Sequence, residues 1–399
     1  MTASQSLVNC RVHRLRWGVR TALLIIEVET STGIVGLGEA SMSGDDARAA
    51  WHISDLFERM LRDRCTDDAP VLVHALARHA ADTVCFVEAT AASALEQALW
   101  DIRGQVRGMP IHELLGGART HVIPLYANIN RVLGARTPAL FAEQAEAARL
   151  AGFRAVKCAP FDEVSPPAID DSFEVLDPGL ARIRAVRSAI GPDIDLMVDC
   201  HGRLGQRRAV AILPQLVLES VKWLEEPVIT NEQMWRVIRR MSPTVGNGWG
   251  TDREALLPIA EQGKIVLAAG EFEVGILAFV ELLALGVIGI VMPDVKHCGG
   301  IWTAANIAAL TAAHGVRLSP HNPSGPVATL ASGHVAAVSP TLDSLEVAWG
   351  ELVPDQGLLS PALGIERGEL AVSDEPGLGA HLIADRVADL RIPLDATNW

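Results

Sequence analysis

The chain has 399 residues, of which 49% are hydrophobic, and a formal net charge of −14 at pH 7. This length exceeds one ordinary domain and the apolar content is ample for a large core, so two domains are expected. The acidic balance, without any run rich in Lys or Arg, disfavours nucleic acid and anionic membranes as partners. A metabolic protein with a small-molecule substrate fits better.

Six cysteines are scattered singly along the chain, without the close spacing of a metal or redox motif. A chain of this size does not need disulfide staples, so single cysteines favour a reducing compartment. The N-terminal stretch MTASQSLVNCRVHRLRWG has no apolar run of signal-peptide length, and we therefore expect a cytoplasmic protein.

The first part of the chain predicts a small α+β domain over residues 1–120. Residues 6–40 read as three strands with Gly-bearing turns between them. From Asp45 to about Gly117 helical periodicity dominates, and glycines and a proline punctuate its end.

The remainder of the chain alternates strand-like and helical patterns. Strand followed by helix, repeated eight times, is typical of a (β/α) barrel, which we place at residues 121–355. A Pro/Gly-rich segment, 356–399, is expected to return to the first domain. The eight strand-like runs are 123–130, 155–160, 195–201, 221–227, 265–271, 287–294, 317–321 and 344–349.

One apolar segment, Val274 to Met292, is nearly long enough to cross a bilayer. It contains Glu281 and Gly286, however, and lies between two acidic strand ends. We interpret it as a helix to Leu285 followed by a buried strand, since parallel strands covered on both faces are continuously apolar. No membrane span is expected.

Acidic side chains stand where three consecutive strands end. Asp199, Glu225 and Glu271 would meet at the rim of the barrel, and three oxygen ligands without cysteine are what Mg²⁺ prefers. His201 follows Asp199 by two residues, which in a strand places it on the same face, about 7 Å away. The pattern indicates a metal site with an acid/base group beside it. Glu273 shares the strand parity of Glu271, so the residues alone leave the third ligand open.

Further polar side chains end the other strands: Lys157, Asp294, His321 and Glu346. Barrel enzymes place catalytic groups at this edge. Solvated loop charges are the alternative for single members of the set, and a core histidine is the alternative for His321.

Several motifs resemble the mandelate racemase branch of the enolase superfamily. They are LWDIRG and PIHELLGG (99–117), then VDCH, LEEP and AGE around the three acids, MPDVKHCGG (292–300) and SPHNPSGPVATLAS (319–332). The resemblance implies an α+β capping domain over a (β/α)7β TIM-like barrel, with Mg²⁺ on Asp199, Glu225 and Glu271. No other cofactor is implied.

The resemblance also implies roles for the remaining residues. His321 would be the base that removes the α-proton of a carboxylate substrate, oriented by Asp294, and Glu346 would bind the substrate carboxylate or the enediolate. An aspartate at 294, where the muconate-lactonizing branch has a lysine, favours racemases and sugar-acid dehydratases. The sequence at this position is Lys157-Cys158-Ala159, so the second lysine that acts as a base in Lys-x-Lys racemases is missing. Lys157 would bind substrate or stabilise charge, or be a salt-bridged lysine at the barrel mouth.

His201 lies in DCHGRL, which resembles galactonate dehydratases, where this histidine is the general acid for the departing hydroxyl. A partner of the metal ligands is its alternative role. The resulting expectation is a hydro-lyase that converts a sugar acid such as D-galactonate to a 2-keto-3-deoxy acid. A racemase or epimerase on the same fold, and a noncatalytic regulator that keeps the fold, are the rivals.

Two further expectations concern loops. Substrate specificity is expected from Trp17 to Arg20 and from Ser41 to Asp46. If residues 232–241 form a helix, the loop at 242–251 precedes the fifth barrel strand and faces the barrel bottom, so this loop is expected to contribute a subunit contact in a homo-oligomer.

Overall fold

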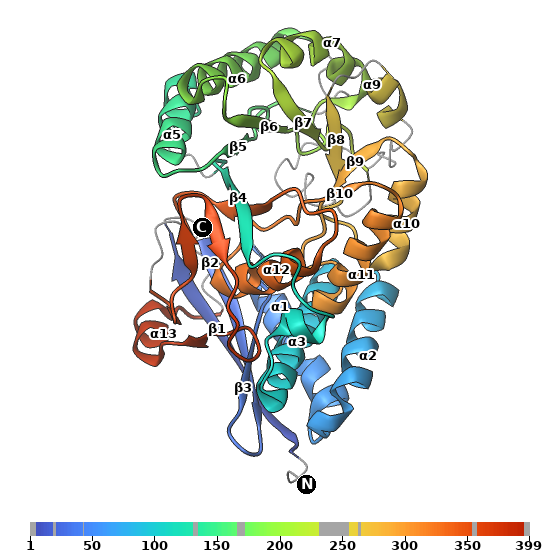
Figure 1. The fold of residues 1–399 in the computed structure, drawn as a ribbon, viewed down its shortest axis with the longest axis vertical. Coiled ribbons are helices and arrows are strands. Elements are labelled where there is room, and N and C mark those ends of the chain that lie inside the picture. Colours follow the sequence, from blue (N-terminus) through green and yellow to red (C-terminus); the bar gives the residue numbers. More distant parts are fainter. Residues whose placement is uncertain are drawn as a thin grey trace.

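The protein consists of an α+β capping domain and a (β/α)7β barrel (Figure 1). The structure, a computed structural model, describes residues 5–18, 21–42, 44–130, 135–165, 172–230, 255–261, 265–352 and 357–394. In Figure 1 the barrel forms the upper part of the molecule, and the blue sheet and helices of the capping domain lie below it. The predicted segment 232–251, with its helix and loop, lies outside the described residues.

The capping domain contains an antiparallel sheet in the order β1-β2-β3, covered by helices. The strands are β1 (Leu7–Trp17), β2 (Thr21–Thr30) and β3 (Val35–Glu39), and the helices are α1 (Asp46–Leu56), the π-helix η1 (Phe57–Leu61), the 3-10 helix η2 (Thr66–Asp68), α2 (Ala69–Asp82), α3 (Phe86–Arg107) and α4 (Ile111–Leu114).

Helix α3 packs against β3 at a distance that only glycine permits. A Cβ atom at Gly36 would lie 2.2 Å from the carbonyl oxygen of Ala98, and one at Gly38 would lie 2.0 Å from that of Ala94. The alternation of glycine in VGLGE therefore reflects close contact of two backbones rather than a flexible turn.

Within the described residues the barrel has eight parallel strands, as the sequence predicts. They are β4 (Val122–Asn128), β5 (Ala155–Cys158), β6 (Asp195–Asp199), β7 (Val221–Glu225), β8 (Val266–Ala269), β9 (Ile288–Val291), β10 (Arg317–Leu318) and β11 (Leu345–Ala348). Strands β4 to β10 pair in chain order, and β11 pairs with β4. A parallel bridge between Leu318 and Leu342 joins β10 to the segment that enters β11.

Helices alternate with these strands in the described part of the barrel: α5 (Pro138–Leu150), the 3-10 helix η3 (Glu174–Leu176), α6 (Asp177–Ile190), α7 (Gly205–Leu218), α9 (Leu256–Glu261), α10 (Gly275–Ala284), α11 (Gly300–Ala313) and α12 (Pro326–Val338). Figure 1 shows them outside the strands. The apolar segment 274–292 forms α10 and β9, as predicted, and no helix in the described residues is long and apolar enough to span a bilayer.

The strands end earlier than predicted. The last ladder residues are Ala269 in β8, Val291 in β9 and Leu318 in β10, two or three positions before the polar residues assigned to those strand ends. Glu271, Asp294 and His321 therefore lie on the loops that follow the strands, where the backbone can turn their side chains toward one another.

The C-terminal segment contacts both domains. It contains β12 (Leu359–Ser360), β13 (Gly364–Glu366), β14 (Glu369–Ala371), β15 (His381–Leu382) and α13 (Ala384–Leu390). Strand β14 pairs antiparallel with the first half of β4, and the backbone of Ile392 donates to Arg14 in β1 over 2.9 Å. The domain limits at 120 and 355 remain predictions.

A buried carboxylate joins the capping domain to the barrel. Glu96, in α3, accepts hydrogen bonds from the backbone N–H groups of Ile301 (2.7 Å) and Trp302 (2.9 Å) at the start of α11, and from Trp100 Nε1 (2.8 Å). The positive end of the α11 dipole thus meets the carboxylate of the other domain.

We expect Glu96→Gln to lower the free energy of unfolding by about 1.5 to 3 kcal/mol, because the amide NH2 faces backbone donors and leaves at least one buried N–H unpaired. Urea unfolding followed by circular dichroism measures this. Glu143→Gln, on the exposed side of α5, is the control. Equal midpoints for the two variants would contradict a domain-linking role for Glu96.

Candidate active site

Alternation along the barrel strands brings acidic side chains into the mouth. Met197 of β6 and Trp223 of β7 belong to a buried cluster inside the barrel. Asp199 and Glu225 follow them by two residues, share their face, and pair with each other in the β6–β7 ladder. Both side chains are almost fully buried.

Lys157 of β5 lies among these carboxylates, fully buried. Its Nζ atom is 2.8 Å from Glu225 Oε1, 3.1 Å from Glu346 Oε1 and 3.7 Å from Asp199 Oδ2. The three N–H donors of the ammonium thus face three carboxylates, which matches the predicted salt-bridged lysine at the barrel mouth. The expected role of Lys157 in binding the substrate or stabilising negative charge remains a prediction.

Each of the three predicted metal ligands lies beside a basic side chain. Glu225 pairs with Lys157, Asp199 Oδ2 lies 3.0 Å from His201 Nε2, and Glu271 Oε2 lies 2.8 Å from His321 Nε2. In the described part of the chain, the one group of three ligating side chains whose donor atoms all lie within 4.8 Å of one another is elsewhere, at His112, His121 and Asp374.

The chemistry of the three carboxylates nevertheless fits a hard cation. They are all oxygen donors, and they lie at or just after the ends of three consecutive strands. Burial and neighbouring carboxylates raise the pKa of Glu225 to about 8, although Lys157 opposes this shift. Negative charge is therefore crowded at this point.

His321 and Asp294 form the predicted dyad. His321 Nδ1 lies 2.9 Å from Asp294 Oδ2, so the aspartate orients the ring and leaves Nε2 facing the barrel mouth. Asp294 is fully buried and also lies 3.4 Å from Lys296 Nζ. Burial lowers the pKa of His321, but Glu271, Glu346 and Asp294 outweigh it and raise the pKa well above its usual value.

His201 forms a second dyad that the sequence did not reveal. Its Nδ1 atom lies 2.6 Å from Asp162 Oδ1. The expected separation of His201 from Asp199 is wrong, because β6 ends at Asp199 and His201 adopts a left-handed φ of 44° that turns its ring back. Asp162 lies on the loop after β5, so the rule that selected the other strand-end residues could have found it.

Glu346 is held more tightly than predicted. It accepts hydrogen bonds from Tyr126 Oη (3.0 Å), from Asn128 Nδ2 and from the backbone N–H of Asn322 (3.1 Å), besides the Lys157 ion pair. These donors engage both carboxylate oxygens, so a substrate has to displace one of them to bind Glu346. Tyr126 and Asn128 lie on β4, beside β11, and were not predicted.

Glu226 directly follows β7, which ends at Glu225, and it has a left-handed φ of 39°. Its Oε1 atom accepts a hydrogen bond from the backbone of Gly270 over 3.1 Å, and its side chain is buried. It therefore supports the loop that carries Glu271.

Family models account for most of the chain. Residues 14–116 match the mandelate racemase/muconate lactonizing enzyme N-terminal domain, and residues 140–386 match the enolase C-terminal domain-like model. The chain belongs to the mandelate racemase branch of the enolase superfamily.

Among its relatives, the D-galactonate dehydratase of Xanthomonas oryzae pv. oryzae (strain PXO99A) is 29% identical over 383 residues, which cover 91% of this chain and 89% of the relative. That of Ralstonia pickettii (strain 12J) is 28% identical over 398 residues, covering 94% and 92%. A mandelate racemase/muconate lactonizing enzyme from Jannaschia sp. CCS1 has a similar structure, with a TM-score of 0.82 at 26% identity and coverage of 97% and 98%. These relatives support an enzyme of the dehydratase or racemase type.

We expect Lys157→Met to lower the free energy of unfolding by about 3 to 5 kcal/mol, because it leaves buried carboxylates without their cation. Lys222→Met is the matched control. Lys222 also pairs with two carboxylates, Asp195 (2.9 Å) and Asp343 (3.0 Å), but its side chain is 25% exposed, so about 1 kcal/mol or less should be lost. Equal losses in urea unfolding would contradict the importance of burial at Lys157.

Proposed function

We propose that this protein is a Mg²⁺-dependent dehydratase of a sugar acid similar to D-galactonate. The observation that carries the proposal is the pair of partly accessible histidines at the barrel mouth, each held by an aspartate at Nδ1. The side chains of His201 and His321 are 30% and 13% exposed, whereas the carboxylates between them are at most 4% exposed. A substrate would therefore meet two imidazoles first.

Elimination of water needs one group that takes a proton from carbon and one that gives a proton to the departing oxygen. His321 suits the first role, because Asp294 holds Nδ1 and Nε2 faces inward. In the bound state the α-carbon would take the place of Glu271 beside Nε2. His201 suits the second role, with Asp162 holding its Nδ1 atom and Nε2 directed toward Asp199. The product would be an enol that becomes a 2-keto-3-deoxy acid.

Asp199, Glu225 and Glu271 are the residues that would hold Mg²⁺, and the ion would supply positive charge for the enediolate. Lys157 would add to that charge, and Glu346 would fix the position of Lys157. The relatives named as D-galactonate dehydratases support the substrate class.

We expect His321→Asn to reduce turnover of sugar acids by about 10² to 10⁴-fold and to abolish exchange of the α-proton in deuterated water. His201→Asn should lose turnover by a similar factor but keep the exchange, because its role follows proton removal. His314→Asn, at the exposed end of α11, should match the wild type.

The assay also separates the rival functions. A dehydratase forms a semicarbazide-reactive keto acid, a racemase or epimerase forms only exchanged or inverted substrate, and a noncatalytic protein does neither. Normal dehydration by both histidine variants would contradict the assigned roles.

Chelation provides an independent test of the metal. We expect a wild-type protein treated with EDTA to lose turnover and to recover it when Mg²⁺ is added, whereas Glu225→Gln should need at least about 10-fold more Mg²⁺ for half-maximal activity, as one charged ligand is lost. Glu261→Gln, exposed at the end of α9, is the control. Full activity after exhaustive chelation would overturn the metal dependence.

A further inference from the structure

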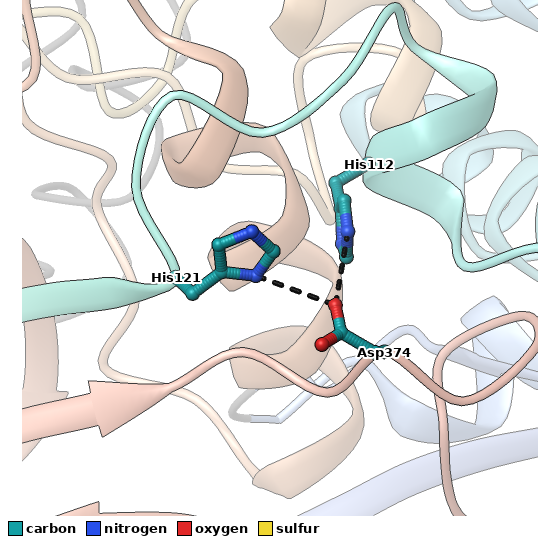
Figure 2. Close-up of side chains that lie close together, drawn as sticks. All are labelled: His112, His121 and Asp374. Atoms are coloured by element: carbon teal, nitrogen blue, oxygen red, sulfur yellow. Dashed lines mark ion pairs between the residues drawn. The ribbon is translucent and has the colours of Figure 1, made fainter.

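Three polar side chains from distant parts of the chain meet away from the barrel mouth (Figure 2). His112 lies in α4, His121 directly precedes β4, and Asp374 follows β14. Asp374 Oδ1 is 3.5 Å from His112 Nε2 and 3.3 Å from His121 Nδ1. The three donor atoms all lie within 4.8 Å of one another.

Backbone contacts hold these segments together independently of the three side chains. The N–H of Val372 donates to the carbonyl of His121 over 2.9 Å, and the N–H of Ile111 donates to Gly377 over 3.1 Å. Binding of a ligand by the three side chains therefore does not require the entropy loss of bringing the three segments into contact.

A neighbouring histidine determines which nitrogen of His112 carries a proton. His334 Nε2 lies 3.4 Å from the carbonyl oxygen of Leu378, so this nitrogen is the donor and Nδ1 is the acceptor. His334 Nδ1 is then the acceptor for the backbone N–H of His112 (3.3 Å) and for His112 Nδ1 (3.1 Å). In this arrangement His112 is protonated at Nδ1, and its Nε2 atom carries a lone pair.

That lone pair is directed toward the carboxylate of Asp374 (Figure 2). The His112 side chain is completely buried, and Nε2 has no hydrogen-bond partner among the described residues. Two electron-rich atoms 3.5 Å apart repel each other unless a cation lies near both.

We propose that His112, His121 and Asp374 bind a divalent first-row transition metal of the Zn²⁺ type. Two ligands of tetrahedral Zn²⁺, each about 2.1 Å from the ion, lie about 3.4 Å apart, close to the separations of Asp374 Oδ1 from the two imidazole nitrogens. Two imidazoles and one carboxylate favour Zn²⁺ over Mg²⁺. The His112–His334 contact then orients the ligand, as the partners of metal-binding histidines do.

The site differs in place and ligand type from the carboxylates of the barrel mouth. It joins α4, the start of β4 and the segment after β14, so the bound ion would fasten the C-terminal segment to the rest of the protein. Water would complete the coordination, since His121 and Asp374 are 53% and 77% exposed.

The test is a Zn²⁺ titration of the purified full-length protein after chelation, in excess Mg²⁺ to occupy the barrel carboxylates. Calorimetry gives the stoichiometry, and the visible absorption of bound Co²⁺ reports a tetrahedral nitrogen/oxygen site. The wild type should bind one equivalent of Zn²⁺ more than the variants His121→Ala and Asp374→Ala. If the variants still bind this equivalent, the wild type should bind it at least about 100-fold more tightly. Its melting temperature should rise with Zn²⁺, while those of the variants should not.

Both variants alter exposed side chains, so they should fold, which circular dichroism checks. The exposed residues His314 and Asp193 supply the matched controls His314→Ala and Asp193→Ala, which should bind Zn²⁺ as the wild type does. Equal stoichiometry, affinity and melting response in the wild type, His121→Ala and Asp374→Ala would overturn the proposal, whatever the outcome at the barrel mouth.

Discussion

Burial of negative charge at the mouth of the barrel is the constraint on which the rest of the structure depends. Parallel strands all end at one edge, and alternation turns Asp199 and Glu225 into the same interior that Met197 and Trp223 fill. A carboxylate removed from water requires a positive partner or several donors. Lys157, His201 and His321 meet this requirement, so any substrate or cation that enters has to exchange with them.

Buried carboxylates also lie at the contact between the two domains, where backbone N–H groups rather than basic side chains are their partners. Glu39 of β3 accepts backbone hydrogen bonds from Gly325 (2.8 Å) and Ala328 (3.0 Å) at the start of α12, as Glu96 does at the start of α11. Each acid meets the positive end of a helix dipole. The start of α12, which Glu39 of the capping domain contacts, follows directly on the loop that carries His321. One continuous segment therefore contacts the capping domain and carries the proposed base.

The fold could be predicted because strand-like runs, most of them largely apolar with a polar group near the end, alternate with helical patterns. The ends of the strands were predicted less accurately than the fold. Residues such as Met292 remain buried after the last residue of the strand ladder, so the apolar pattern does not mark where the strand ends. The principal acids and histidines followed from this pattern. The contacts of Asp162 and Tyr126 could not be predicted, because they depend on the left-handed turn at His201 and on the pairing of β4 with β11.

The position of each strand limits which proton transfers the barrel can support. Strands β6 and β10 are the third and seventh of the eight, so His201 and His321 approach the mouth from opposite sides. Ala159, directly after β5, shares the parity of Lys157 but cannot move a proton, and the Lys157 ammonium faces carboxylates. A racemase needs two groups at one carbon, whereas elimination needs the second group at an oxygen. His201, 3.0 Å from a proposed ligand for the cation, lies where the oxygens of the substrate would gather in the proposed elimination.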